Sequence, residues 1–172
     1  MSFLYRTRQF WSALTAIPAE DDLVQAGKVL SPSLFQLFQR MQPGEQAHSL
    51  AVFRRLREQG EMDRDLWVAA LLHDVGKSCH PLRIWDRAAI VIVQLLLPQR
   101  AKAWGQCQPA GWKRPFVVAE RHPEWGAQLA AQAGASPTTV ELIRRHQEQS
   151  PPPGAVGFER LLLRLQSVDN ER

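Results

Sequence analysis

The chain has 172 residues, of which 45% are hydrophobic and 22% are charged, and its formal net charge is +4. This composition is typical of a globular protein and excludes an intrinsically disordered chain. The length is sufficient for one domain with a complete hydrophobic core.

The distribution of basic residues and cysteines along the chain bears on its partners and its cellular compartment. Basic residues are spread along the chain instead of forming a dense stripe, so we expect solvated helix faces and no nucleic-acid interface. Cys79 and Cys107 show no paired spacing and are expected to be free thiols. Arg6 and Arg8 interrupt the apolar residues at the N-terminus, so no signal peptide is expected, and no apolar run is long enough to span a bilayer. We therefore expect a cytoplasmic protein.

Strand signals are nearly absent, whereas helix start and stop signals recur, which predicts an all-α fold. The spacing of apolar residues predicts a first helix over residues 3–17. A short helix that begins near Asp21 is expected to end at Gly27. Ser31 followed by proline is typical of a helix start, and the helix that it opens is predicted to reach about Met41.

The next two predicted helices contain the first polar candidates. A helix that follows Pro43 and ends near Gln59 places His48 on the same side as its core residues. A buried histidine bonded to a backbone carbonyl is the alternative role for this side chain. Asp63 is expected to cap the following helix, which leads into the stretch LLHDVGK at residues 71–77.

An adjacent imidazole and carboxylate stand at the end of that apolar helix. His73 and Asp74 cannot lie along one line of a regular helix, but a distorted last turn would let them converge on one ion. The alternative is a helix that simply ends, because a histidine suits the C-terminal end of the helix dipole and Gly76 is a usual stop.

Residues 78–121 are interpreted as an insertion between the two halves of the site that the polar candidates would form. Within Ile84–Leu97, residues 88–97 are apolar except for Gln94, and the stretch is too short to cross a bilayer, so we expect a buried core helix. A subunit interface, or a surface that rests on membrane lipid near Trp85 and Trp112, is the alternative. The composition of Gly105–Pro115 predicts a loop, which could cover the site as a lid.

A short helix is predicted over residues 122–133, and Gly134 is expected to end it. Proline is favoured in the first turn of a helix. Pro123 therefore predicts that His122 lies at the N-cap of this helix or just before it.

The last two predicted helices carry the remaining polar candidates. One begins at Ser136 and leads to His146, and three consecutive prolines predict a loop over residues 150–154. The final helix has an apolar face that ends at Val168, and Asp169 is expected one position beyond it.

Six polar residues form an ordered series along the chain: His48, His73, Asp74, His122, His146 and Asp169. This series resembles the H…HD…D signature of the HD-domain metal-dependent phosphohydrolases, and especially of members with two extra histidines for a second metal. The flanking stretches EQAHSLAVFRRL, AALLHDVGK, RHPEWGAQLA, LIRRHQE and LLRLQSVDNE match as well. The resemblance covers about residues 44–171. It implies one all-α HD-domain helical bundle at residues 43–172, preceded by N-terminal accessory helices at residues 1–42.

The resemblance also implies two divalent metal ions. The first would be bound by the residues of the H…HD…D signature: His48, His73, Asp74 and Asp169. Asp74 would bridge to a second ion held by His122 and His146. Such ligands suit Fe, Mn, Co, Ni, Zn or Mg, and two such ions could share a hydroxide that attacks phosphorus.

Two basic residues are candidates for binding the substrate. In similar family members, the lysine one turn past the HD pair contacts the substrate phosphate, so Lys77 is expected to act in substrate binding and catalysis. An exposed lysine near a helix C-terminus is the alternative. Arg145 directly precedes a predicted ligand and is a second phosphate-binding candidate, with a solvated helix face as its alternative.

The resemblance therefore predicts a metal-dependent phosphohydrolase that cleaves a phosphate ester or anhydride of a small nucleotide-type substrate. The alternative is a non-catalytic HD-domain sensor that binds a nucleotide or a partner. Cyclic di-GMP is not an expected substrate, because the doubled histidine and the glycine-tyrosine-proline stretch of the family members that degrade it are both missing after Arg145. For residues 84–97, a homo-oligomer or a peripheral membrane contact is left open.

Overall fold

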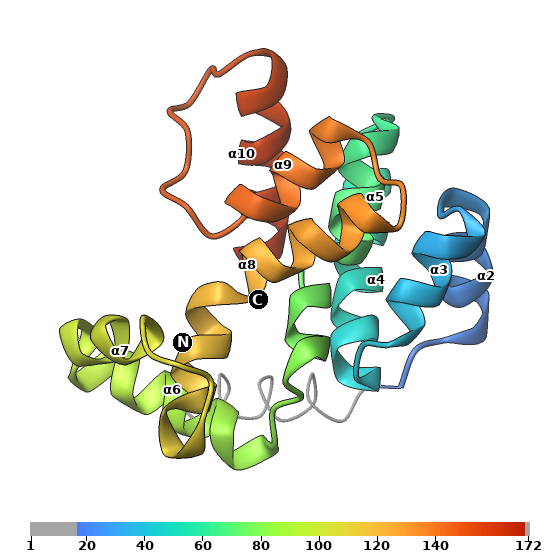
Figure 1. Ribbon diagram of the computed structural model, residues 1–172. Coiled ribbons are helices and arrows are strands. Elements are labelled where there is room, and N and C mark those ends of the chain that lie inside the picture. The colour runs from blue at the N-terminus through green and yellow to red at the C-terminus, as the bar shows by residue number, and fades with distance from the viewer. Residues whose placement is uncertain (1–16, 171–172) are drawn as a thin grey trace, which may run out of the picture.

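The computed structural model describes residues 17–170, so the predicted helix over residues 3–17 falls outside the described residues except for its last position. Within residues 17–170 helices are the only regular secondary structure and there is no strand, which confirms the predicted all-α class. The elements shown in Figure 1 are α2 (Glu20–Val29), α3 (Pro32–Gln39), α4 (Pro43–Glu58), α5 (Arg64–Leu72), the 3-10 helix η1 (Val75–Cys79), α6 (Ile84–Leu96), α7 (Pro98–Gly105), the 3-10 helix η2 (Gly111–Lys113), α8 (Arg114–Gln132), α9 (Pro137–Arg145) and α10 (Gly157–Asn170).

Several helices begin and end at the signals that the sequence contains. Three side chains cap a helix by accepting a hydrogen bond from a backbone amide three residues later: Ser31 at α3, Asp63 at α5 and Ser136 at α9. Gly134, just past α8, has a φ of 86°, the left-handed conformation in which helices commonly end. Helix α2 differs from the prediction, because it continues through Gly27 to Val29.

One hydrophobic core joins α4, α5, α8, α9 and α10, and side chains of α2 and α3 extend it. Helix α4 packs on α5 and α10, while α8 packs on η1 and α9. Figure 1 shows α8 running through the middle of the molecule, between the α6 and α7 pair and the remaining helices. All the helices that carry the polar series therefore border the same core.

The prediction for Pro123 is wrong. Helix α8 begins at Arg114, eight positions earlier than expected, so Pro123 lies inside the helix and His122 is not at its N-cap. Pro115 occupies the first turn instead. An internal proline lacks the amide that would bond to the carbonyl of the residue four positions earlier, here Ala119. The Nδ1 atom of His122 lies 3.1 Å from that carbonyl oxygen and takes the place of the missing donor.

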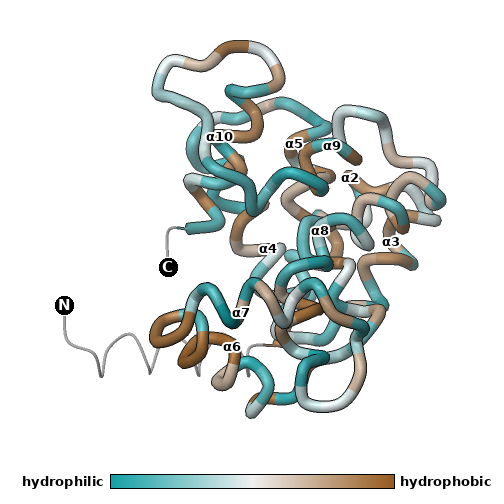
Figure 2. The backbone as a smooth tube through the Cα atoms, turned by 60° about the vertical axis from the view of Figure 1, so that its left-hand side comes forward, coloured by the Kyte–Doolittle hydropathy of each residue, from teal (hydrophilic) through white to brown (hydrophobic). Residues whose placement is uncertain are grey.

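The prediction of a buried helix at Ile84–Leu97 is also wrong. The helix forms as α6, but none of its residues is buried, and Trp85 and Leu95 are each 77% exposed. Helix α6 lies at the edge of the molecule (Figure 2), where α7 and α8 cover only one of its sides. Apolar residues predicted the helix correctly, but a run of them does not reveal whether a second layer covers it.

The stretch between α7 and α8 was predicted to be a loop. The stretch Gly105–Pro115 is a loop only in part, because the single turn η2 forms within it. The ring of Trp104 lies 4.7 Å from that of Trp112 and 5.1 Å from that of Phe116, which holds the stretch against α7 and α8. Its role as a lid stays a prediction.

Over the described range, no helix combines the length and hydrophobicity needed to cross a membrane.

Candidate metal centre

The HD pair lies where α5 ends and η1 begins. His73 keeps helical backbone angles, with φ −55° and ψ −34°, whereas Asp74 departs from them, with φ −94° and ψ 0°. Because the backbone turns between the two residues, their side chains converge, and His73 Nε2 lies 3.7 Å from Asp74 Oδ2. The distorted last turn is the geometry that the sequence predicts for an adjacent pair of ligands.

Gly76 allows η1 to touch α8. A Cβ atom at this position would lie 2.0 Å from the carbonyl oxygen of His122 and 2.7 Å from the amide nitrogen of Gly126, so no side chain fits. The close contact places Asp74 beside the middle of α8, where its Oδ1 lies 3.3 Å from His122 Nε2. Gly76 thus does more than end a helix, the role that its position in the sequence suggested.

Backbone carbonyls orient three buried imidazoles. The Nδ1 atoms of His73, His122 and His146 lie 2.9, 2.9 and 2.7 Å from the carbonyl oxygens of Ala70, Val118 and Ile143, each one turn earlier. A proton on Nδ1 leaves the lone pair of Nε2 free to bind a metal. All three Nε2 atoms are buried without a hydrogen-bond partner in the described structure. Since unpartnered buried polar atoms are costly, a cation is the group that would satisfy all three at once.

The six predicted ligands come together in two adjoining groups. The ligand atoms within each group lie within 4.8 Å of one another, and the groups are His48 with His73 and Asp169, and Asp74 with His122 and His146. The two groups are in contact, because the rings of His73 and His146 lie 5.2 Å apart between centroids. Asp74 faces both groups, with Oδ2 towards His73 and Oδ1 towards His122. The arrangement is compatible with the bridging role expected for this carboxylate.

Burial and neighbouring charges shift the pKa values of the candidate ligands. Burial alone would lower the pKa of His73, but Asp74 and Asp169 outweigh it and raise that pKa to about 9. Burial, together with charge on His73 and His122, lowers the pKa of His146 to about 3. Although burial opposes it, Lys77 and His73 hold the pKa of Asp74 well below its usual range, and His73 and His48 do the same for Asp169. Both carboxylates are therefore ionised at neutral pH and available to a divalent ion.

The raised pKa of His73 gives the metal-free protein a testable pH dependence. A histidine with a higher pKa in the folded state stabilises the fold fully below its ordinary pKa of 6.5, and this contribution is lost as the pH rises through about 9. We expect the free energy of unfolding, measured with urea in the presence of a chelator, to fall over this interval. Asp169→Asn should flatten the fall, because it removes a carboxylate that raises the pKa of His73. An equally steep profile in this variant would contradict the assignment.

The two basic candidates lie in different surroundings. Lys77 adjoins the metal groups, and its Nζ donates a hydrogen bond to Asp74 Oδ2 at 2.7 Å. The guanidinium of Arg145 pairs instead with Glu148 at 2.8 Å and Glu159 at 2.9 Å, and it lies over the ring of Phe158. The structure brings Lys77 to the candidate ligands but gives Arg145 other partners, so substrate binding by Arg145 stays a prediction.

One ion pair near the site, between a buried carboxylate and a half-buried arginine, was not found from the sequence. Glu45 is 2% exposed, and it accepts hydrogen bonds from Arg87 Nη2 at 2.7 Å and from the amide of Gln42 at 3.1 Å. Burial raises the pKa of Glu45 although Arg87 and Lys77 oppose the shift. The pair ties α6 to the first turn of α4, the helix that carries His48. The Gln-x-x-Glu spacing of a capping box was a signal for Glu45, but nothing in the sequence pointed to Arg87 as its partner.

Comparison with known proteins gives one match. A family model described as the HD domain matches residues 46–170, a range that contains all six candidate ligands and Lys77. No curated protein and no solved structure matches the chain.

Proposed function

The chain belongs to the HD domain family, and we propose on this premise that it hydrolyses a phosphate ester or anhydride of a nucleotide-type small molecule. The family generally consists of metal-dependent phosphohydrolases. The observation that carries the proposal is the convergence of three buried, unpartnered Nε2 atoms with two ionised carboxylates. Neither cysteine belongs to the two groups of candidate ligands.

The ligand set indicates which ions would fit and what they would supply. Imidazole nitrogens and carboxylate oxygens suit Mn, Fe, Co, Ni or Zn, and Mg to the extent that carboxylates contribute. When bound, such ions lower the pKa of water and offset negative charge on the phosphoryl oxygens. His48, His73 and Asp169 would hold one ion, and Asp74, His122 and His146 a second, with Asp74 between them.

The chain itself contributes orientation and charge. The carbonyls of Ala70, Val118 and Ile143 keep each Nδ1 occupied, so that each Nε2 faces the same region. Burial of these imidazoles excludes water from their far side and strengthens the electrostatic interactions within the site. Lys77, half-buried beside Asp74, provides a positive charge at the edge of the ligand groups, where a substrate phosphate would need one.

Lys77→Met tests whether this lysine binds the substrate phosphate or serves only as the counter-ion of Asp74. If Lys77 contacts the substrate phosphate, loss of one charge-assisted hydrogen bond should lower kcat/KM about tenfold to a hundredfold, mainly by raising KM. Metal content, measured by elemental analysis, should stay close to that of the wild type. Lys28→Met, in the exposed last turn of α2, is the matched control. A drop in bound metal with unchanged KM would contradict phosphate binding and make Lys77 only the counter-ion of Asp74.

The direct test of the proposed function combines metal analysis with a substrate screen. Protein purified without chelator should contain divalent metal. It should then hydrolyse a member of a panel of phosphomonoesters, cyclic nucleotides and dinucleoside polyphosphates supplied with several divalent ions. Chelation should abolish the turnover, and metal should restore it. Failure to bind any supplied divalent ion would contradict the proposal, whereas tight nucleotide binding without turnover would favour the non-catalytic sensor.

A further inference from the structure

Helix α6 carries its apolar side on the outside of the molecule. Five of its large apolar residues are between 52% and 77% exposed, and we call them the α6 face: Trp85, Val91, Ile92, Leu95 and Leu96. The last four recur at the three- and four-residue spacing of one helix side, and Trp85 lies two turns before Ile92 on that side, while α7 and α8 pack against the helix elsewhere. Figure 2 shows this strongly hydrophobic segment at the margin of the molecule. Contiguous exposed apolar surface of this kind marks an interaction site.

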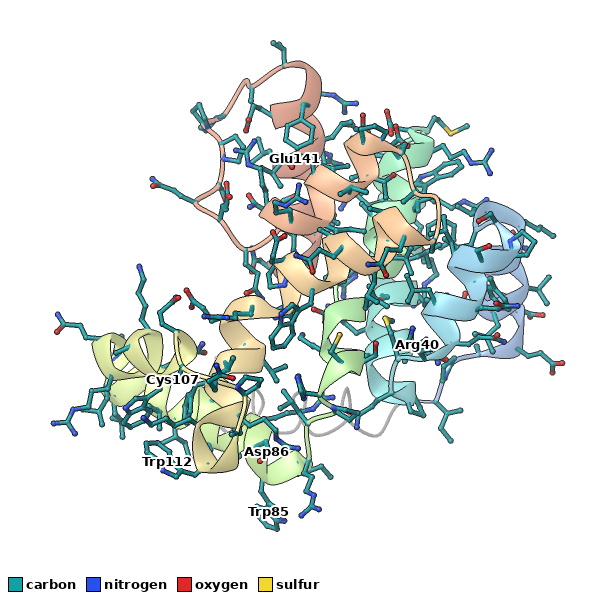
Figure 3. All side chains as sticks on the ribbon, in the orientation of Figure 1. Arg40, Trp85, Asp86, Cys107, Trp112 and Glu141 are labelled. Atoms are coloured by element: carbon teal, nitrogen blue, oxygen red, sulfur yellow. The ribbon has the colours of Figure 1, made fainter. Side chains whose placement is uncertain are left out.

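Two exposed tryptophans lie in this region, one of them Trp85 of the α6 face itself. Trp85 is 77% exposed and Trp112, on η2, is 63% exposed. Figure 3 shows both at the same end of the molecule, and Lys113 Nζ lies 5.6 Å from the centre of the Trp112 ring. Tryptophan is favoured where an apolar layer meets a wet, polar one, because its ring is apolar and its N–H is polar.

The surroundings of the α6 face are strongly basic. Between residues 83 and 114 there are six basic residues and a single acidic one, Asp86. The carboxylate of Asp86 is engaged by Arg114 at 2.8 Å, and Arg87 is engaged by Glu45. Among the described residues, no ion pair occupies Arg83, Arg100 or Lys102, all of which are exposed. An apolar face is thus bordered by uncompensated positive charge.

We propose that the α6 face rests on the surface of an anionic lipid bilayer. The apolar side chains would enter the boundary between headgroups and acyl chains, and the basic residues would contact the anionic headgroups. Helix α6 has 13 residues. At about 1.5 Å per residue it is too short to cross a hydrocarbon layer of roughly 30 Å, so it would lie along the surface.

The charge pattern favours a bilayer over a second copy of the chain. A two-fold dimer places the same patch of both copies face to face, so the basic borders of the two copies would repel each other. An anionic surface attracts the same residues. This inference does not depend on the proposed hydrolase activity, because it uses no residue of the candidate metal centre.

Vesicle flotation of the full chain tests the proposal. Wild-type protein should float with vesicles that contain phosphatidylglycerol and phosphatidylcholine, and far less with phosphatidylcholine alone. High salt should weaken the binding. Leu95→Glu should lower partitioning about tenfold or more, because a charge replaces an apolar group at the boundary. The double variant Arg100→Glu with Lys102→Glu should lower it by a similar factor.

A matched control separates the α6 face from exposed apolar residues in general. Val156, in the loop before α10, is 81% exposed, so Val156→Glu should bind vesicles as the wild type does. All variants should unfold at the wild-type temperature, since the changed side chains are exposed. The proposal is overturned if wild-type protein floats with neither vesicle type, or if Leu95→Glu floats as well as the wild type. If the wild-type protein is a dimer in the absence of vesicles and Leu95→Glu is a monomer, then the α6 face binds a second copy of the chain instead.

Discussion

Asp74→Asn should remove metal from both ligand groups. It should also lower kcat/KM for phosphate-ester hydrolysis by about a hundredfold to a thousandfold. Asp74 belongs to the second group, with Oδ1 3.3 Å from His122, and its Oδ2 lies 3.7 Å from His73 of the first group, so this carboxylate faces both groups. Asparagine has almost the same shape but no charge. Its amide can also donate to an imidazole Nε2, which would satisfy that lone pair without a cation.

The measurements are metal content by elemental analysis and kcat/KM with whichever phosphate ester the wild type hydrolyses. Because the substitution leaves the volume unchanged, the fold should persist, and circular dichroism should be that of the wild type. Asp22→Asn is the matched control, since Asp22 is a surface residue paired with Arg54 at 3.0 Å. It should leave both measurements unchanged. Full metal content and full activity in Asp74→Asn would remove the central role that we assign to this carboxylate.

Gly76→Ala should destabilise the metal-free protein by at least about 3 kcal/mol, a large part of the 5–15 kcal/mol typical of a folded domain. The added Cβ would lie 2.0 Å from the carbonyl oxygen of His122. This neighbour is a backbone atom and has no side-chain rotamer that would relieve the overlap. Either η1 or α8 must therefore move, and the contact that sets Asp74 beside His122 is lost. The melting temperature should fall by about 6–12 °C.

Thermal unfolding in the presence of chelator measures this effect without a contribution from metal. Gly27→Ala is the matched control, because a Cβ there would lie 3.8 Å from Phe35 Cε2, an ordinary contact, in the interior of α2. It should be neutral or stabilise the protein by up to about 1 kcal/mol. If Gly76→Ala melts like the wild type, then the close approach of η1 and α8 does not hold the site together.

The local signals in the sequence predicted the elements well where the physical cause is itself local. Ser31, Asp63 and Ser136 cap helices because each side chain needs only an amide three residues away. Pro123 led to a wrong prediction of where α8 begins. Proline favours a first turn, but the imidazole of His122 supplies a replacement donor to the freed carbonyl, and α8 continues. That compensation depends on a side-chain orientation that spacing along the chain does not show.

The candidate site was predictable as a set of residues but not as a geometry. The order of the six polar residues carried the resemblance, and the structure brings all six together. Their proximity depends on contacts between distant helices, above all the approach of Gly76 to Gly126. Arg145 and Arg87 show the limit of sequence reasoning, because the partners of a long, flexible side chain are decided by whatever elements pack beside it.

The sequence by itself determined that the chain is helical, where most helices begin, and which side chains offer ligands of the kind that divalent metals prefer. Only the tertiary structure decided that three Nε2 atoms and two carboxylates meet, that Asp74 faces both groups, and that α6 turns its apolar side outward. Hydrogen bonds within a helix and caps join residues a few positions apart, so the local sequence specifies them. Convergence and burial depend on which surfaces pack against one another, and that is a property of the whole chain.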